Sequence, residues 1–150
     1  MKNKFYVTTS IAYANSDPHI GYAQELLGAD VVARFHRDIK KDDTFFLTGT
    51  DEHGLKTKKA AEAASLSLED FLHKTATKFQ ELRQLLNLST DDFIRTTDES
   101  RHMPAVVTLW KMLVKNGDLY KKEYKGFYCE GCEAFKTQKE LTDNKCVIHQ

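Results

Sequence analysis

Two short motifs near the start of the chain contain the residues with the clearest chemical potential. They are residues 18–22 (PHIGY) and residues 48–54 (TGTDEHG). Each follows an apolar run typical of a strand, and each begins a run typical of a helix. Because ligands bind at the carboxyl ends of the strands in an open α/β sheet, we expect both motifs to face one crevice. A nucleotide and a small acid can be brought together there.

His19 is expected in the first turn of a helix, where free backbone N–H groups and the helix dipole favour an anion. An imidazole in that place adds a donor that can follow the charge developing on a transferring phosphoryl group. A second interpretation needs no catalysis: His19 helps to cap the helix, and Gly21 permits close helix packing. Taken alone, the His-x-Gly triplet favours the second interpretation.

Asp51 is expected at the mouth of the second strand. A carboxylate there suits a substrate ammonium group through a charge-assisted hydrogen bond. Asp is also a preferred N-cap residue, so Asp51 can cap the helix that follows, and both roles can hold at once. His53 can contact the nucleotide or hold the loop together, and the sequence leaves both open.

The third cluster lies near the end of the chain and has the spacing Cys129-x2-Cys132-x13-Cys146-x2-His149. Two close pairs of such ligands, separated by a loop, are typical of tetrahedral zinc, and four protein ligands make a closed, structural site. A redox Cys-x-x-Cys is the alternative, but it leaves Cys146 and His149 unexplained. Ligand count and spacing favour zinc.

The elements that must position these residues begin with a buried strand over residues 4–9. Asp17 is predicted to cap the next helix, with Pro18 at its first position, and the helix extends to about Asp38. Its expected buried stripe has three- and four-residue spacing: Ile20, Ala23, Leu27, Val31 and Phe35. Residues 44–47 form the second expected strand, and residues 54–64 contain mostly strong helix formers.

Ser67, with Asp70 three residues later, predicts the start of another helix. The buried stripe expected for that helix is Leu68, Leu72, Thr75, Phe79, Leu82 and Leu86. Residues 92–95 form a third expected strand. Thr96 and Glu99 suggest a capping box for a last helix, whose expected apolar face is Met103, Val106, Trp110 and Leu113. Residues 116–118 end that helix.

Strands that alternate with helices predict an α/β fold with a parallel sheet and right-handed crossovers. The amino-acid composition changes after residue 118, where tyrosine, phenylalanine, lysine and glycine alternate before the cysteines. We therefore place a domain boundary near Asp118. A small β-rich, metal-dependent module is expected to follow it.

Composition limits the function classes. The chain has 150 residues, 41% of them hydrophobic and 29% charged, which is typical of one globular domain with an appendage. Lys plus Arg and Asp plus Glu both number 22, so a nucleic-acid partner must meet a local basic patch or a part of the protein outside these residues. No membrane span or signal peptide is expected. Three cysteines in a leaderless chain favour a reducing cytoplasm.

Several segments, taken in order, resemble one family. They are residues 5–9, 13–15, 18–21, 46–54, 92–97 and 126–129. This series is similar to the amino-terminal half of the catalytic domain of bacterial-type methionyl-tRNA synthetases, and the likeness covers nearly all 150 residues. The resemblance implies a class I synthetase with a Rossmann-type catalytic domain. Residues 1–118 are then its amino-terminal half, and residues 119–150 begin a zinc-binding connective insertion.

The resemblance also implies roles for individual residues. The family signature His-Ile-Gly-His falls on residues 19–22, so that His19, Gly21 and Tyr22 bind ATP and His19 stabilises the transition state of adenylate formation. Tyr22 departs from the signature, because a phenol can donate a hydrogen bond but cannot carry positive charge at neutral pH. The resemblance therefore implies a catalytic role for Tyr22 only as a hydrogen-bond donor.

On the amino-acid side, the resemblance places Ile11 and Tyr13 at the wall of the methionine side-chain pocket and Asp51 on the methionine ammonium. The implied reaction is attack of the methionine carboxylate on the α-phosphorus of ATP, supplied with Mg²⁺. The acyl group of the resulting methionyl-adenylate then passes to tRNA(Met). Zn²⁺ is the implied structural cofactor, held by the cysteine and histidine cluster, and no membrane partner is implied.

The family's second nucleotide motif, Lys-Met-Ser-Lys-Ser, does not occur in the 150 residues. We therefore expect that these residues alone do not aminoacylate tRNA. Two alternatives remain open: a class I synthetase for leucine, valine or cysteine, and a non-catalytic module derived from a synthetase that binds tRNA or a protein.

Overall fold

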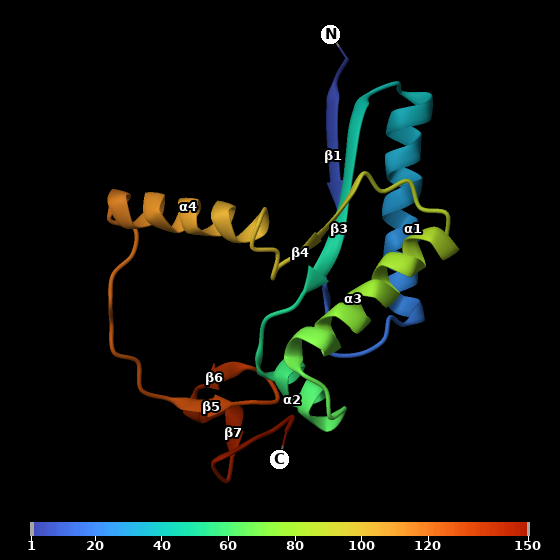
Figure 1. The fold of residues 1–150 in the computed structure, drawn as a ribbon. Helices are drawn as coiled ribbons and strands as arrows, with labels where there is room; N and C mark the ends of the chain where they lie inside the picture. Colours follow the sequence, from blue (N-terminus) through green and yellow to red (C-terminus); the bar gives the residue numbers. More distant parts are fainter. Residues whose placement is uncertain (1, 150) are drawn as a thin grey trace. The chain divides into compact units, whose positions relative to one another are not determined.

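Strand β3 (Asp43–Asp51) is the centre of a four-stranded parallel sheet (Figure 1). Strand β1 (Lys4–Thr8) pairs with residues 43–47 of β3, and β2 (Ala12–Tyr13) pairs with residues 50–51, so both follow the same edge of β3. Strand β4 (Asp92–Arg95) pairs with residues 47–50 from the other edge. The carboxyl-terminal end of β3 is therefore flanked on both sides, which confirms the predicted parallel α/β arrangement.

The computed structural model describes residues 2–149 and divides the chain into two compact units between Ala105 and Val106. The helices of the first unit are α1 (Ile20–Arg34), a π-helical continuation η1 (Phe35–Ile39), α2 (Leu55–Ala63) and α3 (Leu68–Leu85). Helix α4 (His102–Asn116) crosses the division. The second unit adds β5 (Phe127–Cys129), β6 (Ala134–Lys136), the 3-10 helix η2 (Gln138–Glu140), β7 (Leu141–Thr142) and β8 (Lys145–Cys146).

The strands expected at residues 4–9, 44–47 and 92–95 are all present, but β3 extends four residues beyond its expected end, to Asp51. The short strand β2 was not expected from the sequence. Its two residues have no alternating pattern of their own, and they become a strand by pairing with the extended end of β3. Both differences lie where β3 approaches the second motif.

Gly49 allows β4 to approach β3 closely. A Cβ atom at residue 49 would lie 2.1 Å from the carbonyl oxygen of Ile94, its partner in the parallel register. No side chain fits in that space, so the glycine is a steric requirement of the sheet.

Helices α1 and α3 meet in a small core beside the sheet (Figure 1). Its buried side chains are Tyr22, Leu26, Phe79 and Phe93, and the rings of Tyr22 and Phe79 meet edge to face with 5.2 Å between their centroids. The stripe expected for α3 is confirmed at Leu72, Thr75 and Phe79, but its first member, Leu68, is exposed.

The stripe expected for α1 is wrong. The buried residues of α1 are Tyr22, Leu26, Asp30 and Ala33, whereas Ile20 is 88% and Val31 67% exposed. Apolar residues occur on both sides of this helix, so their spacing did not single out the face that packs. The packed face is defined by partners elsewhere in the chain, such as Phe79, and by a hydrogen-bonded aspartate.

That aspartate, Asp30, is buried and ties α1 to the segment that leads into β4. Its Oδ2 accepts from Nε of Arg34 at 2.6 Å, and its Oδ1 accepts from both the amide and the hydroxyl of Ser89 at 2.6 Å. Burial, the largest influence, raises the pKa of Asp30, but the hydrogen bonds from Ser89 and Arg34 outweigh it and hold the pKa below its usual value.

Of three helix caps predicted from the sequence, one is confirmed and two are wrong. Ser67 caps α3 as predicted, with its side chain accepting from the Asp70 amide at 3.1 Å. Asp17 does not cap α1, because the cap is His19. The capping box expected at Thr96 is also wrong: α4 begins at His102, and the Thr96 hydroxyl instead accepts from the Glu52 amide at 2.8 Å.

The second unit consists mainly of two antiparallel pairs of short strands. Strand β5 pairs with β6, and β7 pairs with β8. The ring of Phe135 contacts the rings of Tyr124 and Tyr128 edge to face. The division between the units falls within α4, earlier in the chain than the boundary expected near Asp118. Within residues 2–149, no helix has both the length and the apolar character needed to cross a membrane.

Candidate functional site

His19 is the N-cap of α1 and has extended backbone angles. Its Nδ1 accepts from the amide of Tyr22 at 3.3 Å, and its carbonyl oxygen accepts from the amides of Tyr22 and Ala23. The capping interpretation is therefore confirmed. A neutral imidazole that accepts through Nδ1 has its proton on Nε2, so the cap also fixes which atom can donate to a ligand.

Gly21 leaves space for the imidazole. A Cβ atom at this position would lie 3.1 Å from both Nδ1 and Cε1 of His19. The His-x-Gly spacing thus allows the ring to fold over the first turn of the helix. The sequence-based alternative for Gly21, close packing between helices, is not what the geometry shows.

Tyr22 is buried, and its hydroxyl joins a chain of hydrogen bonds beneath the first turn. The hydroxyl lies 3.0 Å from Oγ1 of Thr48, which lies 2.7 Å from Oγ1 of Thr9, and it also donates to the carbonyl of Gly49 at 3.4 Å. Burial raises the pKa of Tyr22, and the bonds to the threonines oppose that rise only in part. The phenol is therefore neutral at physiological pH.

A cavity of about 510 Å³ opens beside this turn. It is lined by Ile11, Tyr13, His19, Gly21 and Tyr22, together with neighbours from residues 10–25 and Phe79. The structure thus brings together all the residues assigned to ATP and two of the three assigned to methionine. Ile11 and Tyr13 are 39% and 36% exposed, so both apolar surfaces are accessible to a ligand.

Asp51 does not line this cavity, although it lies next to one of its walls. It is the last residue of β3 and pairs in register with Tyr13 of β2. Its carbonyl oxygen accepts from the amide of Ala14 at 2.9 Å. The Asp51 backbone therefore lies beside that of Tyr13, at the end of β3.

The alternative role of Asp51 as a helix cap is contradicted. Gly54, with φ of 128°, occupies the N-cap of α2, and no side chain caps that helix. The Asp51 carboxylate accepts a local hydrogen bond from the His53 amide at 3.4 Å. His53 holds the loop, since its Nε2 lies 3.1 Å from the carbonyl of Thr96.

Two acidic residues, one lining the cavity and one next to Asp51, were not singled out from the sequence. Glu25 accepts from the amide and hydroxyl of Ser10 at 2.6 and 2.8 Å, which fixes the start of the loop that carries Ile11. Glu52 is buried between β3 and β4. Glu52 could have been found from the sequence, because it lies inside the second motif. For Glu25 the sequence gives no indication beyond its position in a helix.

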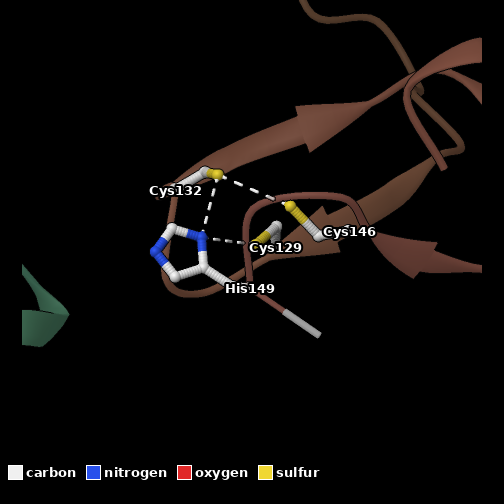
Figure 2. A group of neighbouring side chains, drawn as sticks. All are labelled: Cys129, Cys132, Cys146 and His149. Atoms are coloured by element: carbon white, nitrogen blue, oxygen red, sulfur yellow. Dashed lines mark hydrogen bonds between the residues drawn. The ribbon is translucent and has the colours of Figure 1, made fainter. Parts of the chain in front are cut away.

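The three cysteines and His149 converge in the second unit (Figure 2). Their sulfur and nitrogen ligand atoms all lie within 4.8 Å of one another. Sγ of Cys132 lies 3.7 Å from Sγ of Cys146 and 3.2 Å from Nδ1 of His149, and Sγ of Cys129 lies 3.8 Å from the same nitrogen. The structure therefore assembles all four residues predicted from the spacing.

These separations fit a tetrahedral metal ion. With metal–sulfur bonds of about 2.3 Å, tetrahedral ligands lie roughly 3.7 Å apart. Gly131 makes the fit possible, because a Cβ atom there would lie 2.5 Å from Cγ of His149. The arrangement leaves no ligand position for a reacting water, which suits a structural ion.

The thiols have unequal acidity before any metal binds. The amides of His149 and Ile148 donate to the sulfur of Cys146 and lower its pKa to about 6. Burial raises the pKa of Cys132, and the neighbouring cysteines raise it further. A cation at the centre of the cluster would favour the thiolate form of all three.

Comparisons with known proteins show which family this chain is similar to. The family model described as tRNA synthetases class I (M) matches residues 5–149. A methionine–tRNA ligase from Rickettsia typhi is 46% identical over 145 residues, which cover 97% of this chain and 28% of that protein. The structure of Mycobacterium tuberculosis methionyl-tRNA synthetase in complex with methionyl-adenylate matches with a TM-score of 0.88 and 41% identity, over 97% of this chain and 28% of that one.

A more distant structure shares only the fold. A LeuRS complex from Agrobacterium radiobacter matches with a TM-score of 0.73 at 19% identity, over 97% of this chain and 19% of that one. The chain thus spans little more than a quarter of the length of the methionine–tRNA ligases from Rickettsia and Mycobacterium that it matches. On the family match and these identities, the chain belongs to the class I tRNA synthetases (M), and it corresponds to their amino-terminal part.

Proposed function

We propose that this chain is the amino-terminal part of a methionine–tRNA ligase. The complete protein activates methionine with ATP and Mg²⁺, forms methionyl-adenylate and pyrophosphate, and transfers the methionyl group to tRNA(Met). The observation that carries the proposal is the cavity at the start of α1, which joins the His19 cap to the Ile11 and Tyr13 wall. The relatives named above, one of them in complex with methionyl-adenylate, support it.

On the nucleotide side, His19 contacts the ATP phosphates. Its Nε2 donates to the charge that grows on the phosphoryl oxygens, while its Nδ1 maintains the helix cap. Gly21 binds ATP by allowing the imidazole to lie over the helix start, where the dipole also favours the phosphates. Tyr22 forms the floor of the ATP side, with its hydroxyl bonded to Thr48.

On the amino-acid side, Ile11 and Tyr13 enclose the apolar methionine side chain, and the Asp51 carboxylate binds the ammonium group. The pairing of Tyr13 with Asp51 across β2 and β3 supports this assignment, because it places an apolar wall and an anionic group next to each other. The chain then holds the carboxylate of methionine toward the α-phosphorus of ATP. Positioning and charge stabilisation account for this step without a general base.

Cys129, Cys132, Cys146 and His149 hold a structural Zn²⁺ in the second unit. The tetrahedral separations and the soft thiolate ligands support zinc. The ion fixes a segment in which three of the four ligands lie at the surface or are half-buried. Because thiolate ligands must stay reduced, we propose a cytoplasmic location for the protein.

An ATP–pyrophosphate exchange assay on the full-length protein tests the proposal. Methionine is expected to support exchange, and leucine, valine and cysteine are expected not to. The 150-residue chain alone is expected to give no exchange, since the family's second nucleotide motif does not occur in it. Exchange supported by another amino acid would reassign the substrate, and no exchange with any amino acid would leave a non-catalytic binding module.

A further inference from the structure

Glu52 has a fully buried charged side chain directly beside Asp51, and the proposed reaction does not use it. Its side chain is 0% exposed. A carboxylate is buried at a high cost unless it is paired and hydrogen-bonded. The hydrogen-bond donors to the Glu52 carboxylate therefore show which segments this buried charge holds together.

Three donors bind the Glu52 carboxylate. Oε1 accepts from the hydroxyl of Thr50 at 2.8 Å and from Nε of Arg95 at 2.7 Å, and Oε2 accepts from the hydroxyl of Thr97. These donors come from β3, from the last residue of β4 and from the loop after β4. The carboxylate thus joins the carboxyl-terminal ends of two neighbouring strands.

The backbone around Asp51 is held from both sides. After Asp51, the Glu52 amide donates to the hydroxyl of Thr96 at 2.8 Å. At Asp51 itself, the carbonyl accepts from the Ala14 amide at 2.9 Å. Both of these bonds hold the peptide unit between Asp51 and Glu52. The Thr96 amide donates to the Thr50 carbonyl at 3.2 Å and so holds the peptide unit before Asp51. The Asp51 Cα atom, which carries the carboxylate side chain, therefore lies between two hydrogen-bonded peptide units.

We propose that Glu52 and Arg95 form a positioning pair that holds the Asp51 carboxylate where the methionine ammonium binds, an inference that rests on the proposed function of the site. A charge that is already oriented binds more tightly, because no ordering of the loop has to accompany binding. Arg95 suits this role, since its guanidinium has a rigid donor geometry and stays charged.

The test uses two variants of the full-length protein, Glu52→Gln and Arg95→Lys. The control is Asp30→Asn, which removes another buried carboxylate with an arginine and a hydroxyl partner, but one bonded at α1 and Ser89. Two readouts are needed. The first is the KM for methionine, the KM for ATP and kcat in the exchange assay, and the second is amide hydrogen exchange at residues 51–53.

Glu52→Gln is expected to raise the KM for methionine on the order of tenfold and to change kcat by less than about twofold, because binding is weakened in the ground and transition states alike. Hydrogen exchange at residues 52 and 53 is expected to become faster. Arg95→Lys, which keeps the charge, is expected to give a smaller change in the same direction. The control is expected to change neither readout.

An unchanged KM for methionine in Glu52→Gln would overturn the proposal, and so would an equal rise in the Asp30→Asn control. If Glu52→Gln does not fold, Arg95→Lys carries the test against the same control. If the wild type shows no methionine-dependent exchange, the proposed function fails separately. Hydrogen exchange then tests the Glu52–Arg95 pair by itself. Unaltered protection of residues 52 and 53 in Glu52→Gln would contradict the pair.

Discussion

The imidazole of His19 lies over Gly21, where any other residue would place its Cβ atom 3.1 Å from the ring. The two residues act together, because the cap bond from the Tyr22 amide orients the ring and the glycine leaves the space for it. Capping and catalysis are thus compatible uses of one side chain. Nδ1 serves the helix, and Nε2 is the atom proposed to serve the nucleotide.

Two substitutions of His19, made in the full-length protein like those below, separate these uses. His19→Ala removes both, whereas His19→Asn retains a good N-cap and loses the imidazole. We expect both variants to form methionyl-adenylate about 100-fold more slowly or worse, as for a lost transition-state donor. Only His19→Ala is expected to lower the free energy of unfolding, by about 1 kcal/mol. Single-turnover rates and urea denaturation measure the two effects, and a wild-type rate in His19→Asn would exclude the imidazole from the chemistry.

Gly21→Ala tests the space above the helix. The added methyl group meets the imidazole and displaces it, so we expect a roughly tenfold slower activation rate. The matched control is Gly28→Ala in the same helix, where nothing lies within 4 Å of the new Cβ atom. That control is expected to stabilise α1 by about 0.5–1 kcal/mol and to leave the rate unchanged. Equal rates in the two variants would show that ring placement does not matter.

Asp51→Asn is expected to weaken methionine binding by about 10- to 100-fold, since a hydrogen bond to a charged group contributes about 1.5–3 kcal/mol. The fold is expected to survive, because Asp51 caps no helix. Titration calorimetry with methionine measures the change. Asp43→Asn, at the other end of the same strand, serves as the control. Unaltered affinity in Asp51→Asn would remove the ammonium contact from the proposed site.

Cys132→Ser is expected to release the metal ion, since Cys132 contacts both Cys146 and His149. Elemental analysis of the purified protein should give about one zinc per chain for the wild type and well below one for the variant. Lys139→Ala, an exposed substitution in the same unit, is the control and should keep its zinc. Full occupancy in Cys132→Ser would contradict the ligand set.

The pKa of Asp30 makes stability depend on pH. Because the pKa is lowered in the folded state, the carboxylate contributes stability above its unfolded pKa of about 3.9, and that contribution is lost as the pH falls through the folded value. Asp30→Asn should therefore lower the urea midpoint at pH 7 and flatten its fall below about pH 4. Asp17→Asn, which breaks the exposed ion pair with Lys78, should have little effect. Parallel pH profiles of wild type and Asp30→Asn would rule out this role.

The sequence predicted those parts of the fold that depend on local pattern. Ser67 marked the start of α3, and the metal ligands were all assigned from their spacing. These features depend on residues close in the chain or on ligand chemistry that few side chains share.

What the sequence did not predict depends on long-range partners. The buried face of α1 includes Asp30, which is polar and becomes a core residue only through Ser89, 59 residues later. Thr96 was predicted to cap a helix, but its hydroxyl accepts a hydrogen bond from the Glu52 amide, 44 residues earlier. Strand β2 exists only because β3 extends beside it. In each case a tertiary contact replaced the local preference.

The missing side chain at Gly49 also decides how β3 and β4 find each other. Only a glycine can sit opposite the Ile94 carbonyl at this separation, so a shift of β4 by one residue would place the side chain of Thr48 or Thr50 in that gap. A pairing shifted by one residue is therefore sterically disfavoured. Gly49 thus helps to fix the alignment of β4 with β3. The hydrogen bond from Arg95 to Glu52 depends on that alignment.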